Sequence, residues 1–480
     1  MQILNQRTIL LCSVFLLCAP PTIPVAAQTL ARPGWAGSGL TQETWWQNAV
    51  FYRVQPKNFQ DSDGDGTGDL RGIAQRLDYL QSLGVDAIVL ESPFDDAGFD
   101  DLLSEATSRH VRIIVELAPH HEGGAQQALA EARSWLTRGA AGLYAKSSLF
   151  ASPAGTADPL QPLRQLVNSF PGDRILLTDN DPAAATARRG QRGASHELVD
   201  FNLGKGAATL ENYRGELAAV QASPDMPLVL QLDGQTPPEA SLAKIAATML
   251  LASHGPASLH DGQEIGIERA STMQWTPGNI TLPKPTEPVA EAPKPTPTPQ
   301  REDVYTAFVP YVPPPTKPKP RPIDPRTGEP SADPNSLMGF TSGKLPAEAS
   351  VPGHESLNVA IEDLNPDSLL NFYRRLSQLH HGSPALQTGS LSVLDHNADN
   401  ALVWVRQAPG VRETGTVIIA CNLSAKTTTL SLQNDIERLH LRPGGLRMLL
   451  VSDKANMRFQ TTQQLTLAPW SVFIGELHSY

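Results

Sequence analysis

The sequence predicts an α/β protein built on a (β/α)8 barrel, also called a TIM barrel, and two patterns support this. From residue 49 onward, short apolar runs rich in β-branched residues alternate with amphipathic helical stretches. Continuous apolar runs separated by helices are typical of parallel strands that are covered on both faces. Eight such runs within about 230 residues fit the repeat of this barrel.

The individual elements follow from the period of the apolar residues. Strands are expected at residues 49–54, 87–90, 112–117, 140–145, 174–178, 197–201, 227–232 and 257–260. Helices are expected between them at residues 70–82, 99–109, 126–137, 208–221 and 240–252. Helical spacing returns at residues 367–380. From residue 389 to the end, short alternating strands with Asn, Gly and Pro turns predict a small antiparallel β domain.

Composition divides the chain into a globular part and one proline-rich tract. The charge of −11 argues against a nucleic-acid partner, because proteins that bind nucleic acids are usually basic. Of 42 prolines, nineteen fall within residues 282–352. Repeats of this kind form extended, solvated segments, so we expect residues 277–338 to be disordered. Tyr305, Phe308 and Tyr311 offer a docking patch for a protein partner, although a plain linker is the favoured interpretation.

The N-terminus predicts export from the cytoplasm. Arg7 precedes an apolar run at 8–19, and small residues stand before Gln28, as in a secretory signal sequence at residues 1–27. An uncleaved anchor is the alternative. No later segment is long and apolar enough to span a membrane, so we expect a secreted or periplasmic protein. Removal of the signal leaves Cys421 as the one cysteine, which excludes an internal disulfide and fits a buried core thiol.

An acidic loop follows the first strand. Residues 61–69 place acidic side chains at positions 1, 3, 5 and 9, and Thr67 can offer its carbonyl oxygen. Hard oxygen ligands in this pattern suit Ca²⁺, and four carboxylates so close together repel one another without a cation. The predicted set for a structural Ca²⁺ is Asp61, Asp63, Asp65, Thr67 and Asp69. Gly72 stands where an EF-hand has glutamate, and an acidic turn without metal is the alternative.

Several long segments closely resemble the α-amylase family, glycoside hydrolase family 13, and within it the α-glucosidase and oligo-1,6-glucosidase branch. The resemblance covers roughly residues 41–480. The segments that carry it are 45–54, 61–69, 77–88, 262–266, 273–275, 339–344 and 367–376. It implies a calcium-bearing barrel followed by a C-terminal antiparallel β-sandwich domain.

The resemblance also sets the expected domain boundaries. Family members run almost directly from the segment at 273–275 to that at 339–344, so the proline tract is an insertion after the eighth strand. The expected domains are a barrel at 41–276, the insertion at 277–338, the end of the barrel with its last helix at 339–385, and the β domain at 386–480.

Family members are retaining glycosidases, in which two carboxylates about 5–5.5 Å apart cleave the sugar and a third steadies it. The resemblance places the nucleophile after strand four, where this chain has Lys146. An ammonium cannot form the glycosyl ester, and it opposes the positive charge of the transition state.

The other family positions are also altered. The acid/base position holds Asp179, whose side chain is one methylene shorter than glutamate, and a turn or capping role is the favoured alternative. The third carboxylate is retained as Asp233. After strand three only His121 matches a sugar-binding histidine, and a metal site at His120 and His121 is weakly supported.

Two shortened segments predict a shallow, open cleft. The family's substrate segment after strand two is missing, since residues 99–106 fit a helix better, and only Glu122-Gly-Gly124 stands where the family inserts a separate domain. The sequence therefore predicts a catalytically inactive member, a pseudoenzyme, that binds an α-glucan, an oligosaccharide or a protein. One alternative is a weak α-glucosidase that uses Asp179 and Asp233. Another is a protein whose working part is the proline tract, presented by the barrel.

Overall fold

The computed structural model describes the chain between residues 45 and 479, with gaps. The described residues are 45–118, 124–146, 160–179, 196–201, 210–221, 228–232, 240–267, 271–276, 339–340, 357–394, 400–408, 410 and 415–479. The predicted signal sequence at 1–27 and the predicted proline-rich insertion at 277–338 lie outside the described residues and stay predictions.

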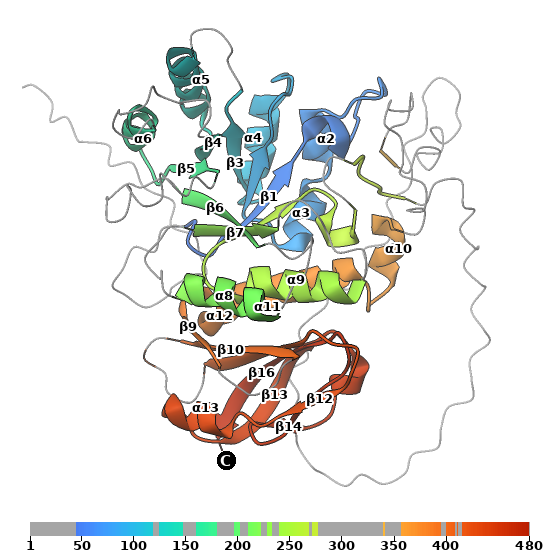
Figure 1. Ribbon diagram of the computed structural model, residues 1–480. Coiled ribbons are helices and arrows are strands. Elements are labelled where there is room, and N and C mark those ends of the chain that lie inside the picture. Colours follow the sequence, from blue (N-terminus) through green and yellow to red (C-terminus); the bar gives the residue numbers. More distant parts are fainter. Residues whose placement is uncertain are drawn as a thin grey trace, which may run out of the picture. The chain divides into compact units, whose positions relative to one another are not determined.

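Eight parallel strands form a closed barrel (Figure 1). Each strand pairs with the next along the chain, and β1 also pairs with β8. The strands are β1 Val50–Val54, β2 Ala87–Leu90, β3 Arg112–Glu116, β4 Gly142–Ala145, β5 Ile175–Thr178, β6 His196–Phe201, β7 Leu228–Leu232 and β8 Ala257–His260. The barrel predicted from the sequence is confirmed, and each strand boundary lies within two residues of its expected position.

Helices follow the strands around the barrel (Figure 1). They are α1 Pro56–Phe59, α2 Leu70–Gln75, α3 Leu77–Leu83, α4 Phe99–Ser108, α5 Gly124–Arg138, α6 Gln161–Asn168, α8 Leu210–Gln221, α9 Ala240–Ala252, the 3-10 helix η2 Gln263–Ile265, α10 Val359–Leu364, α11 Leu369–Gly382 and α12 Pro384–Thr388. Helix α6 was not predicted, although Leu163, Leu166 and Val167 have helical spacing and are buried.

The single helix predicted at 70–82 is wrong, because the chain breaks at Arg76 into α2 and α3. Arg76 leaves helical geometry with φ −105° and ψ 8°. Its guanidinium lies 4.1 Å from the centre of the Trp275 ring and donates a 2.7 Å hydrogen bond to Gln60 Oε1. These tertiary contacts outweigh the local helical pattern.

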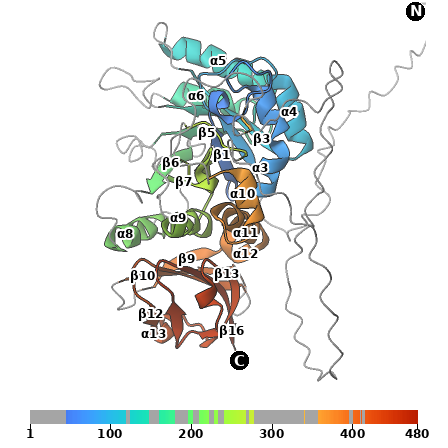
Figure 2. The same cartoon turned by 90° about the vertical axis from the view of Figure 1, so that its right-hand side faces the viewer.

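The C-terminal residues form two antiparallel sheets, as predicted (Figure 2). The larger has the order β14-β13-β16-β11-β10-β9, and the smaller pairs β12 with β15. The elements are β9 Ser390–Val393, β10 Ala401–Gln407, β11 Thr416–Asn422, β12 Thr428–Leu430, α13 Gln433–Arg438, β13 Gly444–Val451, η4 Lys454–Asn456, β14 Gln460–Thr461, β15 Leu465–Leu467 and β16 Val472–Ser479. Cys421 is fully buried in β11, as expected. Trp404 on β10 donates a 2.9 Å hydrogen bond to Ala252 O of α9, which joins this part to the barrel.

A buried carboxyl group links β1, α3 and η2 through hydrogen bonds outside the barrel interior. Glu264 in η2 is fully buried, and its Oε1 accepts hydrogen bonds from Tyr52 on β1 at 2.9 Å and from Tyr79 on α3 at 2.6 Å. Burial raises the pKa of Glu264 to about 7, although the two hydroxyl donors oppose that shift. The folded protein therefore binds a proton at this group more tightly than the unfolded chain does.

This raised pKa predicts that stability falls as the pH rises from about 4.5 to about 7. Between these values the folded state holds a proton on Glu264 that the unfolded state has released. We expect Glu264→Gln to remove about 3 kcal/mol of that pH dependence, since each pKa unit corresponds to roughly 1.4 kcal/mol. Urea unfolding at pH 5 and pH 8 measures this. The exposed Glu437→Gln is the control, and an unchanged slope in Glu264→Gln contradicts the assignment.

Candidate active-site region

Strand alternation decides which side chains enter the barrel. Phe51, Val89, Ile114 and Val229 pack together in its interior, whereas Tyr52, Ile88 and Val115 belong to the core under the helices. Because side chains alternate, the residue two positions further along each strand also points inward. At the carboxyl ends of these four strands, the inward-pointing residues are polar. They are Arg53, Glu91, Glu116 and Gln231.

Arg53 lies at the centre of this polar layer. Its Nη2 is 2.5 Å from Glu91 Oε1, and its Nη1 donates a 2.9 Å hydrogen bond to Gln231 Oε1. The guanidinium carbon is 4.8 Å from the centre of the Tyr144 ring. The side chains of Arg53 and Glu91 are only 6% and 5% exposed. Burial alone lowers the pKa of Arg53, but Glu91, Tyr144 and Glu116 reverse this, so the net shift is upward and the group stays charged.

Lys146 joins the same layer from β4. Its Nζ is 2.7 Å from Glu116 Oε1, and the two side chains are 51% and 4% exposed. Glu116 Oε2 also accepts a 3.3 Å hydrogen bond from the Ser92 backbone N–H. Burial raises the pKa of Glu116, and the Lys146 ammonium opposes this. Burial lowers the pKa of Lys146, but Glu116 reverses the shift, so Lys146 is a cation held by a buried carboxylate.

The predicted catalytic positions are partly brought together. Lys146 and Asp179 directly follow β4 and β5, whose last residues Ala145 and Thr178 are register partners. Asp179 is half-buried. Tyr144 has a raised pKa, mainly through burial, and the nearby charge of Asp179 contributes to the rise. Asp233 and His121 lie outside the described residues, so these two assignments stay predictions. The predicted helix after strand two is confirmed as α4.

Sequence reasoning missed Arg53 and Glu91 as members of this region. Both continue the inward alternation of otherwise apolar strands, and a charged residue in a buried strand needs a partner of opposite charge. A charged residue at an inward position of an apolar strand was therefore the feature of the sequence that could have identified Arg53 and Glu91. What the sequence left undetermined is the pairing, because Arg53 reaches Glu91 and Lys146 reaches Glu116 across neighbouring strands.

The acidic loop after β1 brings three of its five predicted ligands together. Oxygen atoms of Asp61, Asp63 and Asp65 all lie within 4.8 Å of one another. Asp61 is buried and accepts hydrogen bonds from the backbone of Gly64 at 2.7 Å and Gly66 at 2.8 Å. These bonds hold the loop closed around the three carboxylates.

The other two predicted ligands serve the loop itself. Asp69 Oδ1 accepts a 2.7 Å hydrogen bond from Gly72 N and so caps α2, and its Oδ2 accepts from Ser62 N and Oγ, each at 2.9 Å. Thr67 N donates to Asp65 Oδ1 at 2.7 Å. The three clustered carboxylates fit an oxygen-ligated cation such as Ca²⁺. That Asp69 and Thr67 complete the set stays a prediction.

Part of this chain has recognisable relatives. Residues 53–102 match the family model for the alpha amylase catalytic domain. The glucan 1,6-alpha-glucosidase of Streptococcus pneumoniae is 45% identical over an alignment of 102 residues, and the match covers 17% of this chain and 19% of that protein. The oligo-1,6-glucosidase of Bacillus cereus is 38% identical over an alignment of 102 residues, and the match covers 17% of this chain and 18% of that one. These matches show a likeness to the α-amylase family, glycoside hydrolase family 13, on its α-glucosidase-like branch.

The matched segments span about a fifth of the relatives' own length. Solved structures extend the likeness over most of this chain. The trehalulose synthase of Pseudomonas mesoacidophila gives a TM-score of 0.64 at 18% identity, covering 92% of this chain and 100% of that one. The isomaltulose synthase of a Klebsiella species gives 0.65 at 15% identity, covering 91% and 100%. At this identity the likeness shows the fold. No helix in the described part of the chain has the length and apolar character to cross a membrane.

The Lys146–Glu116 pair predicts a measurable stability effect. Lys146→Ala leaves the buried Glu116 carboxylate without its cation, so the free energy of unfolding falls by about 1–2 kcal/mol at neutral pH. Half-exposure of Lys146 keeps the effect below that of a fully buried pair. The loss shrinks as the pH is lowered, because a protonated Glu116 needs no cation. Denaturant unfolding between pH 4 and pH 8 measures this.

The matched control is Lys454→Ala. Lys454 Nζ lies 2.6 Å from Asp367 Oδ2, but those side chains are 71% and 54% exposed, so Lys454→Ala should lower the free energy of unfolding much less than Lys146→Ala does. Equal effects of the two lysine variants contradict the role given to Glu116.

Proposed function

We propose that this α-amylase-family chain binds carbohydrate without cleaving it. The observation that carries the proposal is Lys146. It stands at the end of β4, where the family resemblance places the nucleophile, and its ammonium is engaged by the buried Glu116 carboxylate. A retaining mechanism needs a carboxylate there to form the glycosyl ester and to favour the developing positive charge.

The neighbouring charges support the same conclusion. Arg53 and Lys146 are cations, Glu91 and Glu116 are anions, and each cation contacts one anion. These four charges cancel, which leaves Asp179 as the one further carboxylate described near Tyr144. An oxocarbenium-like transition state is stabilised by a more negative site. The buried Arg53 also places a positive charge at the carboxyl end of the barrel, the end at which barrel enzymes have their active sites.

The proposed ligand is an α-linked glucose oligosaccharide. The names of the relatives support this choice, since they include a glucan 1,6-alpha-glucosidase and an oligo-1,6-glucosidase. Solved structures of the same fold were obtained with isomaltulose and with glucose. A secreted or periplasmic location and a protein partner for the proline tract remain part of the proposal, on the sequence arguments given above.

Incubation with maltose, isomaltose and p-nitrophenyl α-glucoside tests the proposal. We expect no release of glucose or nitrophenol above the rate without protein. Asp179→Ala and Asp233→Ala serve as controls. Turnover by the natural chain that either variant abolishes would overturn the proposal and favour the alternative, a weak α-glucosidase that uses these two carboxylates.

We also propose that the loop at 61–69 holds a structural Ca²⁺. The three carboxylates of Asp61, Asp63 and Asp65 support this, and a cation there would relieve their mutual repulsion. The loop precedes α2 and is closed by its own hydrogen bonds, so the ion would stabilise the connection between β1 and α2.

Calcium is expected to stabilise the folded protein. In chelator-treated protein, Ca²⁺ at a hundredfold excess over its dissociation constant should add about 3 kcal/mol to the free energy of unfolding. The exposed Asp63→Ala removes one ligand and should abolish most of that gain, and Asp78→Ala, on an exposed carboxylate of α3, should retain it. Thermal melts with and without Ca²⁺ measure the effect. An equal gain in all three proteins counts against the site.

A further inference from the structure

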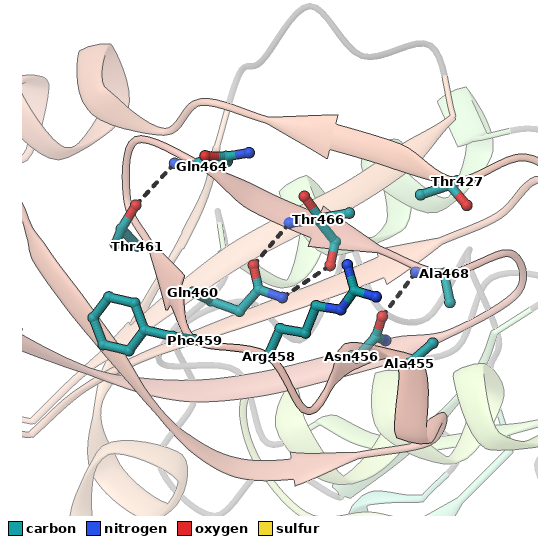
Figure 3. A pocket seen from close by; sticks show the side chains of 10 residues that line it. All are labelled: Thr427, Ala455, Asn456, Arg458, Phe459, Gln460, Thr461, Gln464, Thr466 and Ala468. Carbon is teal, nitrogen blue, oxygen red and sulfur yellow. Dashed lines mark hydrogen bonds between the residues drawn. The ribbon is translucent and has the colours of Figure 1, made fainter.

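A pocket lies in the C-terminal β domain, apart from the polar layer of the barrel (Figure 3). Its volume is about 400 Å³, within the range of pockets that hold small ligands. The segments 455–461 and 464–468 supply most of the lining, and Thr427 completes it. We propose that this pocket binds an oligosaccharide of α-linked glucose. The choice of sugar rests on the proposed function, whereas the pocket itself does not.

The floor of the pocket is rigid because its buried polar groups bond to the protein itself. Gln460 Nε2 donates to Thr466 O at 3.1 Å, and Gln460 Oε1 accepts from Thr466 N at 2.9 Å. Asn456 Oδ1 accepts from Ala468 N at 2.8 Å, and its Nδ2 donates to Ser471 Oγ at 2.9 Å. These bonds fix the backbone of both lining segments, so the pocket is formed before any ligand arrives.

Three other lining side chains keep their hydrogen-bonding capacity. The side chains of Arg458, Gln464 and Thr427 are exposed and make no hydrogen bond or ion pair with the part of the chain that the structure describes. Together they offer guanidinium and amide donors, an amide carbonyl acceptor and a hydroxyl that does both. This mixture matches a ligand with many hydroxyl groups, each of which is also both donor and acceptor.

An aromatic ring lies at the edge of these residues (Figure 3). Phe459 is 75% exposed, a large value for an aromatic side chain, and it lines the pocket beside Arg458. An exposed ring next to hydrogen-bonding groups suits a ligand with one apolar face and a polar rim. A pyranose ring has this form, because its C–H bonds gather on its faces and its hydroxyls on its edge.

Other small ligands fit less well. A phosphate or carboxylate would face a single cation, Arg458, with no second basic side chain in the lining. A purely apolar ligand would leave the guanidinium and amide groups unpaired. A neutral polyol uses both the ring and the polar groups, and the observations therefore favour sugar.

Calorimetric titration of the full chain with maltohexaose and with isomaltotriose tests the inference. Phe459→Ala should weaken binding of at least one of these about tenfold, a change that corresponds to roughly 1.4 kcal/mol. Gln464→Ala should weaken it as well. Leu364→Ala is the matched control, since Leu364 is an apolar side chain that is 80% exposed and does not line the pocket. Thermal melts of each variant check that the fold is intact.

The outcomes separate this inference from the proposed function. Binding that Phe459→Ala leaves unchanged but Asp179→Ala removes would overturn the pocket and keep the barrel as the sugar site. No saturable binding of either sugar up to 10 mM would overturn the pocket too. Glycoside turnover would overturn the proposed function, whereas the tenfold loss in Phe459→Ala would still establish the pocket.

Discussion

The buried ion pair between Arg53 and Glu91 constrains the carboxyl end of the whole barrel. A guanidinium that is 6% exposed costs far more than the fold can supply unless an anion contacts it. Once Glu91 fills that role, Gln231 and the face of Tyr144 occupy the remaining sides of the cation. Glu116, next to Glu91 in the layer, then needs a cation of its own, and Lys146 supplies it. Lys146, which the family resemblance places at the nucleophile position, is thus part of a charge balance that begins on β1.

The barrel itself could be predicted because its strands bury both faces. Such strands leave continuous apolar runs that local pattern reveals, as at Ala87–Leu90 and Ala257–His260, where expected and observed bounds coincide. Failures occurred where a distant contact decided the local structure. Arg76 breaks a regular helical pattern because its guanidinium packs over the ring of Trp275, which lies about two hundred positions later in the chain. Helix α6 was missed because it is short, although its buried leucines have the right spacing.

The positions of the candidate site residues could be predicted from the sequence, but the residues with which they form ion pairs could not. Strand order and the family resemblance located Lys146 and Asp179 at neighbouring strand ends, and the register of β4 with β5 agrees. The acidic loop could be predicted because its candidate ligands lie within nine residues of one another in the sequence. Three of its carboxylates do lie close together in the structure. The ion pairs were not readable, because each joins residues from different strands. The C-terminal pocket gave no sequence signal, since its lining, although almost all within residues 455–468, consists of common residue types without a recognisable motif.

The charge balance also bears on the proposed inactivity, because an aspartate at position 146 alone would not produce a retaining site. An aspartate in place of Lys146 would bring a third carboxylate beside Glu116 and Glu91 and leave Arg53 as the nearby cation. Such crowding raises carboxyl pKa values, and a protonated carboxyl is a poor nucleophile. A retaining site needs one ionised carboxylate and one that holds a proton about 5–5.5 Å away. The Arg53 cation would also remain and oppose the positive charge of the transition state. Several positions around the barrel would have to change together, because each charge in this layer is set by its neighbours.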